Sequence, residues 1–109
     1  MTTPRVGQPV RGSRSGRPIM AVLDLLGRRW ALRVLWELMP APAKFRELQA
    51  RCDDVSPTVL NTRLYELREA GIVELTPDGG YRITREGASL ISALRPLFEW
   101  AQGWAARQS

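Results

Sequence analysis

The chain has 109 residues, the length of a single domain with one hydrophobic core. Apolar residues make up 44% and charged residues 25%, as in ordinary globular proteins, and no apolar run reaches the ~20 residues that a membrane-spanning helix needs. Histidine, the commonest general base and metal ligand, is absent, and Cys52 is the only cysteine, so we expect no enzyme, no metal site, no cofactor and no internal disulfide.

The positive charge is concentrated at the N-terminal end. Of the formal net charge of +5, residues 1–17 carry +4, because they hold four arginines and no acidic residue. Their composition, rich in Gly, Pro and Ser, predicts a flexible basic arm before a domain of residues 18–109. An excess of positive charge favours a polyanionic partner. The arm lacks the apolar stretch of a secretion signal, and a cytoplasmic location is expected.

Two helices are predicted in the first part of the domain. Pro18 suits a first helical turn, and the apolar run that follows it ends at Gly27. A second apolar run over residues 30–39 has helical spacing and stops before two prolines, which cannot continue a helix. Trp30 and Trp36 in this run are expected to lie in the core.

A short helix and a longer one come next. Residues 45–52 are spaced to place one face of a third helix on the core. Ser56 is then predicted to cap a fourth helix, with Pro57 at its first position and Gly71 as a left-handed cap at its end. Core-facing leucines recur through this fourth helix, namely Leu60, Leu64 and Leu67.

The remaining residues predict a hairpin and a terminal helix. Residues 72–76 and 81–84 alternate as two strands around a four-residue turn. A long helix follows from Arg85, with Pro96 as a candidate bend. The fold class is therefore mainly α with a small β-hairpin (α+β), in the element order of a winged helix-turn-helix.

This order predicts a DNA-binding surface. In a helix-turn-helix the first helix braces the second, whose exposed N-terminal half enters the major groove. Asn can bond adenine, Thr can meet a thymine methyl group or a phosphate, and Arg can contact guanine or a phosphate. We expect these side chains to stand clear of the protein body. The recognition-helix candidates are Ser56, Pro57, Thr58, Asn61, Thr62, Arg63 and Tyr65.

The hairpin and the third helix supply further candidate contacts. Gly79 and Gly80 would let the backbone of the turn approach a nucleic acid, and Arg82 adds a cation beside them. Asp78 has the wrong charge for this role and is expected to cap the turn. Candidate cations at the start of the third helix are Lys44 and Arg46.

Several segments together resemble a known family. These are PI at 18–19, LDLLGRRW at 23–30, FREL at 45–48, SPTVLNTRL at 56–64 and ELREAGIV at 66–73. In order and spacing they are similar to the HxlR-type winged-helix regulators, relatives of the MarR group. Double-stranded DNA is the expected partner, and the resemblance implies a pseudo-palindromic operator. Repression is expected ahead of activation, and a small-molecule effector of unidentified chemistry is a candidate further partner.

The same resemblance implies a homodimer formed through the first and last helices, and a phosphate contact by Arg29, where the family usually has lysine. Two departures are visible. Arg17 stands where many members carry a redox-sensing cysteine, and the turn between Thr76 and Tyr81 is shorter than usual, so reduced wing contacts are expected. The expected interface residues are Ile19, Leu23, Leu94, Leu97, Phe98, Trp100 and Trp104.

Alternatives remain beside these expectations. Cys52 is a candidate redox thiol, although a lone apolar-face cysteine is more often a small core residue. Trp100 and Trp104 could line a ligand pocket instead of a dimer interface. The arm could enter a minor groove or merely be solvated. A winged helix could also serve as a protein-interaction or dimerisation module without specific DNA binding.

Overall fold

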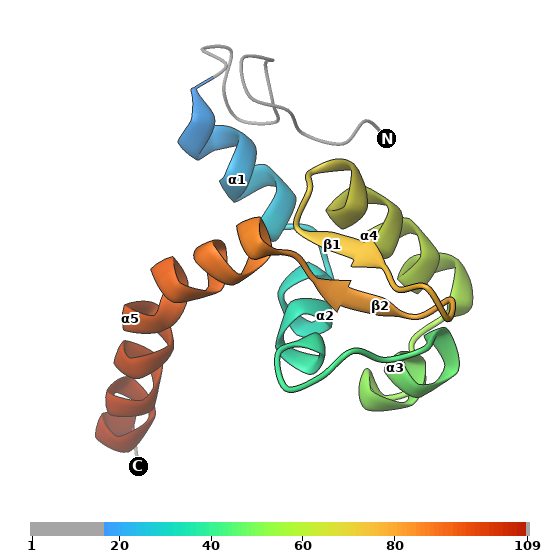
Figure 1. Ribbon diagram of the computed structural model, residues 1–109. Coiled ribbons are helices and arrows are strands. Elements are labelled where there is room, and N and C mark those ends of the chain that lie inside the picture. Colours follow the sequence, from blue (N-terminus) through green and yellow to red (C-terminus); the bar gives the residue numbers. More distant parts are fainter. Residues whose placement is uncertain (1–16, 109) are drawn as a thin grey trace.

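The computed structural model describes residues 17–108 and is mainly helical (Figure 1). The order of its helices and strands confirms the predicted winged helix-turn-helix. The basic arm lies outside the described residues except for Arg17. The elements in chain order are α1 (Pro18–Leu26), α2 (Ala31–Leu38), α3 (Phe45–Arg51), α4 (Pro57–Glu69), β1 (Val73–Leu75), β2 (Tyr81–Ile83) and α5 (Arg85–Gln108).

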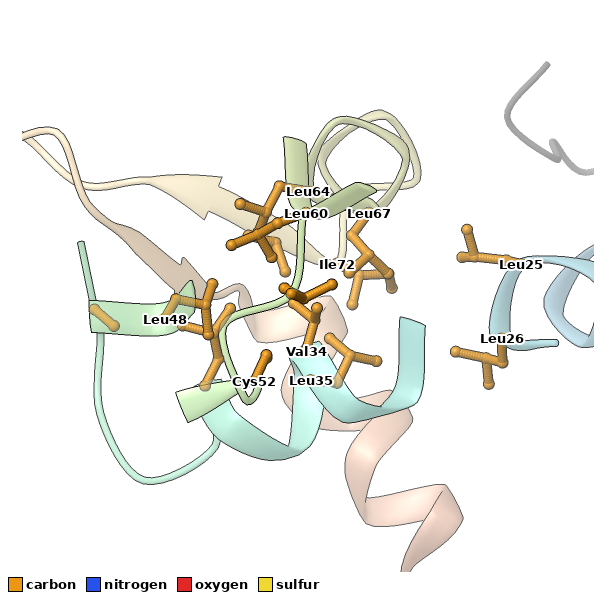
Figure 2. Packing of buried hydrophobic residues seen from close by; sticks show 14 residues of the cluster. Leu25, Leu26, Val34, Leu35, Leu48, Cys52, Leu60, Leu64, Leu67 and Ile72 are labelled. Atoms are coloured by element: carbon orange, nitrogen blue, oxygen red, sulfur yellow. The ribbon is translucent and has the colours of Figure 1, made fainter. Parts of the chain in front are cut away.

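The core lies between α2 and α4. Leu60, Leu64 and Leu67 are at most 1% exposed, as their spacing predicts, and they face Val34 and Leu35 of α2 (Figure 2). Burying a side chain of this size contributes roughly 1.5–3 kcal/mol of transfer free energy. The two helices are therefore held together mainly by apolar packing, which presents the opposite side of α4 to solvent.

Local signals fix both ends of α4. The backbone N–H of Val59 donates to Ser56 Oγ at 3.2 Å, and Pro57 occupies the first turn, so the predicted cap is confirmed. At the other end Gly71 has a φ of 78°, a left-handed conformation that glycine adopts without steric strain. The recognition-helix candidates therefore sit on a helix with a defined start.

The hairpin is antiparallel and is tied to the segment before α3. Its register pairs Val73 with Ile83 and Leu75 with Tyr81. The N–H of Ala43 donates to the Tyr81 carbonyl at 3.0 Å, and the N–H of Tyr81 donates back to Ala43 at 2.8 Å. This reciprocal pair attaches the turn end of β2 to the segment that leads into α3.

Helix α5 starts against the hairpin and then extends away from the body. Helix α1 extends from the body on another side (Figure 1). Pro96 lies inside it, and in Figure 1 the helix changes direction along its length, as expected. Trp36 of α2 packs edge-on against Phe98 of α5, with ring centroids 5.3 Å apart. The expectation that Trp36 lies in the core is wrong: it is 51% exposed, because it sits on the outer side of α2.

None of the helices in residues 17–108 is long and apolar enough to cross a membrane.

Candidate nucleic-acid interface

One face of α4 is polar and open to solvent. Thr58, Asn61, Thr62 and Tyr65 are all exposed there, as expected, and Ser56 and Pro57 are exposed at its start. The Thr62 hydroxyl donates to the Thr58 carbonyl at 2.9 Å, and the Tyr65 hydroxyl donates to Glu69 Oε1 at 2.7 Å. Because these residues are all exposed, the face is not covered by another described part of the chain.

Arg63 does not belong to this exposed face. Its side chain is 15% exposed, its Nε donates to the Arg29 carbonyl at 2.7 Å, and its guanidinium pairs with Glu66. The expectation that Arg63 stands clear of the body is therefore wrong. Its position explains why: Arg63 lies three residues after Leu60 and four before Leu67, on the side of α4 that turns inward.

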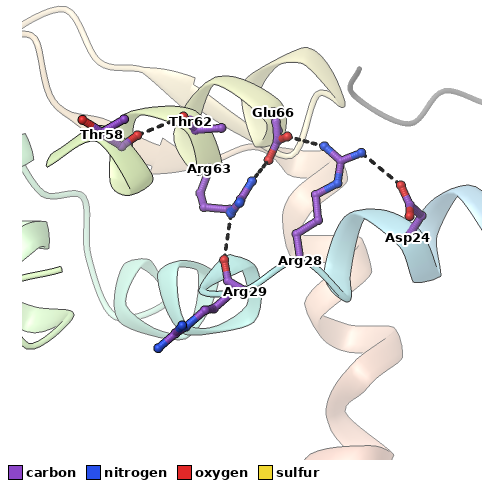
Figure 3. A network of polar contacts seen from close by, with 7 residues as sticks. All are labelled: Asp24, Arg28, Arg29, Thr58, Thr62, Arg63 and Glu66. Atoms are coloured by element: carbon purple, nitrogen blue, oxygen red, sulfur yellow. Dashed lines mark hydrogen bonds and ion pairs between the residues drawn. The ribbon is translucent and has the colours of Figure 1, made fainter. Parts of the chain in front are cut away.

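A buried charge network that the sequence patterns do not predict packs against α4. Glu66 is 2% exposed and Arg28 8% exposed, and the two side chains pair (Figure 3). Arg28 also pairs with Asp24 of α1 at 3.0 Å. The Asp24–Arg28 spacing of four residues is a recognisable helical pair, but nothing local in the sequence marks Glu66 as their partner.

Exposed cations also lie outside α4. The side chains of Arg29, Lys44 and Arg46 are exposed. Arg82 is half-exposed, and its Nε donates to Glu74 Oε2 at 2.7 Å across the hairpin. Any contact of Arg82 with a phosphate would therefore compete with this ion pair.

The wing turn differs from expectation at one glycine. Gly79 is exposed with a φ of 87°, whereas Gly80 is buried, and a Cβ on it would lie 3.1 Å from the Ala43 carbonyl oxygen. The expectation that the Gly80 backbone can approach a nucleic acid is thus wrong, because the Ala43 segment already fills that space. Asp78 takes part in the turn, as expected: the Thr76 hydroxyl bonds its carboxylate and holds the pKa of Asp78 below its usual value.

Cys52 lies in the core with the leucines of α2, α3 and α4 (Figure 2). It is 0% exposed, and burial raises the pKa of its thiol despite the opposing charge of Arg33. Both features disfavour the thiolate that oxidation requires. The thiol therefore has the surroundings of a small core residue.

Apolar side chains are exposed along α1 and α5. Trp100 and Trp104 stack with their ring centroids 5.7 Å apart and are 55% and 48% exposed. Ile19, Leu23 and Leu97 are exposed to a similar degree. Of the other expected interface residues, Leu94 packs partly against the core, and Phe98 packs against Trp36.

A cleft of about 440 Å³ opens between α1, the end of α4 and the first turns of α5. Its lining is mostly apolar, with Val22, Leu25 and Leu90 among the contributing side chains. Glu69 and Glu86 are also among its lining residues. In size and character it resembles the pockets that hold small organic molecules.

Comparison with known proteins identifies relatives of this arrangement. Residues 25–109 match the family described as HxlR-like helix-turn-helix. The chain is 31% identical over 88 residues to the HTH-type transcriptional regulator YvaP of Bacillus subtilis, a match that spans 75% of this chain and 82% of YvaP. It is 32% identical over 91 residues to YodB of the same organism, spanning 78% of each chain. Two mycobacterial relatives are longer, and the chain spans 61% of their length.

Solved structures show the same fold. The quinone-bound structure of YodB from B. subtilis has a TM-score of 0.67 and 33% sequence identity, covering 83% of this chain and 97% of YodB. A MarR-family regulator from Enterococcus faecalis has a TM-score of 0.73 and 27% identity, covering 83% and 87% of the two chains. The arrangement of the helices and the hairpin is thus shared with proteins of both groups.

Proposed function

Because this chain belongs to the HxlR-like helix-turn-helix family of transcriptional regulators, we propose that it acts as a homodimer that binds a pseudo-palindromic operator and represses transcription. The observation that supports this proposal best is the open polar face of α4. That face begins at a capped helix N-terminus, which itself favours phosphate. An operator bound in this way would be blocked to other DNA-binding proteins.

Sequence preference would come from a few side chains of α4. Asn61 offers both a donor and an acceptor, which suits adenine in the major groove, and Thr58 and Thr62 flank it. Arg29, Lys44 and Arg46 carry exposed positive charge and would hold the DNA backbone without reading its sequence. We assign Arg63 to positioning α4, since its guanidinium is already bonded within the protein.

The homodimer would form through α1 and α5. Their exposed side chains include two stacked indoles and several aliphatic groups, and residues of this kind dominate the centres of protein interfaces. A two-fold dimer presents two copies of α4, which matches an operator of two inverted half-sites. A small-molecule effector would fit the cleft beside α1, where it would touch both α4 and α5.

The test is a fluorescence-anisotropy titration with DNA from upstream of the protein's own gene and with a scrambled duplex of equal length. We expect saturable binding to the upstream DNA that weakens as salt rises. Asn61→Ala should lose roughly 1–3 kcal/mol of preference for the correct base, whereas Gln102→Ala, which removes an exposed amide from α5, should behave as wild type. Equal affinity for both duplexes would contradict the proposal.

A further inference from the structure

Four buried or half-buried charges connect α4 to the first helix. Asp24, Arg28, Arg63 and Glu66 form what we call the charge clamp (Figure 3). The side chain of Glu66 is 3% exposed, and its two oxygens are divided between two guanidinium groups: Oε2 receives Arg28, and Oε1 receives Arg63. Arg28, itself 5% exposed, also reaches Asp24 Oδ2 at 3.0 Å.

The clamp holds α4 at two points. Arg28 reaches Glu66, while Arg63 reaches the carbonyl oxygen of Arg29, the next residue after Arg28, at 2.7 Å. The Arg63–Glu66 pair closes the ring on the α4 side. Because the two attachment points lie almost one turn apart on α4, the ring opposes both rotation and sliding of that helix, which a single contact would allow.

Stability alone does not account for this arrangement. A buried ion pair is weak evidence for stability, since apolar residues of the same volume often stabilise a fold equally well. Guanidinium–carboxylate pairs are directional, however, and they fix geometry more closely than apolar contacts do. The clamp residues of α4 are also largely buried, whereas Asn61 and Thr62 are exposed, so the clamp is positioned to orient the helix and not to touch DNA.

We propose that the charge clamp fixes the orientation of α4 relative to α1, and that it thereby sets the spacing between operator half-sites that the dimer accepts. This inference rests on the proposed function, in which α1 belongs to the dimer interface and α4 reads DNA. The two recognition helices of a dimer must enter grooves one helical turn apart, so a change in the angle between α1 and α4 alters their separation directly. Glu66 is the central positioning residue, because both guanidinium groups meet on it.

The test compares Glu66→Gln with Glu37→Gln. Glutamine keeps the shape of Glu66 but removes its charge. Glu37 pairs with Arg33 at 2.8 Å within α2, so Glu37→Gln removes the same charge from a pair that does not reach α4. Residual dipolar couplings of backbone amides then report the orientation of α1 relative to α4 in the free protein. We expect wild type and Glu37→Gln to give one relative orientation, and Glu66→Gln to give a different or averaged one.

The second measurement uses operators whose half-sites are moved apart or together by one and two base pairs. Wild type and Glu37→Gln should prefer one spacing by at least tenfold, and Glu66→Gln should reduce this preference below threefold while binding a single half-site within twofold of wild type. Unchanged helix orientation in Glu66→Gln, or an unchanged spacing preference, would overturn the inference, as would a wild type that accepts all spacings equally.

A substitute variant and the DNA-free measurement keep the inference testable if Glu66→Gln does not fold or if the proposed function fails. If Glu66→Gln does not fold, Arg28→Lys takes its place, because lysine keeps the charge but cannot reach Asp24 and Glu66 together in a planar fork. If wild type shows no sequence preference on any DNA, the proposed function fails. The dipolar couplings still decide whether the clamp orients α4, because they are measured without DNA.

Discussion

The Cys52 sulfur lies among core leucines and is fully screened from solvent. Because burial raises the pKa of this thiol, its thiolate fraction at neutral pH is smaller than that of an exposed cysteine. We expect iodoacetamide or a simple quinone to modify Cys52 at least about tenfold more slowly in the folded protein than in denaturant, as followed by mass spectrometry. Equal rates in the two states would show that the sulfur is open to solution and would restore the redox interpretation.

At Gly87 the space available for a side chain decides how a substitution affects stability. A Cβ at this position, in the first turns of α5, would lie 2.3 Å from the Ile72 carbonyl oxygen and 2.7 Å from Ile83 Cγ2. The first of these neighbours is backbone and cannot turn aside. We therefore expect Gly87→Ala to lower the free energy of unfolding by about 1–3 kcal/mol, measured by urea denaturation.

Gly103 provides the matched control for Gly87. It lies in the same helix, where a Cβ would meet only the flexible end of Arg107 at 3.1 Å. Gly103→Ala should leave stability unchanged or raise it by up to about 1 kcal/mol, because alanine favours the helix. A similar loss in both variants would mean that the close approach of α5 to the hairpin is not the cause.

At the scale of elements, an ionised carboxylate contributes to the wing turn. The Thr76 hydroxyl, with help from the Gly80 N–H and the charge of Lys44, lowers the pKa of Asp78. A lower pKa in the folded state means that the charged form stabilises the turn. This contribution is complete above the usual pKa of aspartate and is lost as the pH falls through the lowered value.

Carboxyl NMR titration checks this dependence. Asp78 should titrate at a lower pH in the folded protein than in unfolded peptide, and Thr76→Val should move its pKa back upward because the donating hydroxyl is lost. Thr58→Val, which removes an exposed hydroxyl from α4, should leave it unchanged. An Asp78 pKa that does not respond to Thr76→Val would argue against the hydroxyl as the cause.

Element order and helix ends could be predicted because their signals are local. Ser56, Pro57 and Gly71 mark α4 within a few residues, and leucine spacing identifies its core face. The burial of Arg28 and Glu66 could not be predicted, since charged residues usually face water and these partners stand 38 positions apart. Arg63 was open to prediction, because it shares the inward side of α4 with Leu60 and Leu67.

For the whole molecule, the exposed aromatic face of α5 bears directly on assembly. If Trp100 and Trp104 anchor the dimer, replacing both with Ser should weaken self-association by about 2 kcal/mol or more, or about thirtyfold in Kd. Sedimentation velocity over a concentration series measures this change. The control, Leu75→Ser, removes an exposed apolar side chain from β1 and should not alter association. An unaltered dimer in the double variant would place the interface elsewhere.

The reciprocal bonds between Ala43 and Tyr81 bear on how the wing can vary in length. They hold Tyr81, the first residue of β2, directly beside the turn, so residues added at the exposed tip need not move the strands or α3. Insertions at Gly79, which is exposed, should therefore be tolerated, whereas insertions between Pro40 and Ala43 would shift the pairing of the strand edge. Evolution or engineering can thus lengthen the wing at its tip alone, while α4 keeps its place.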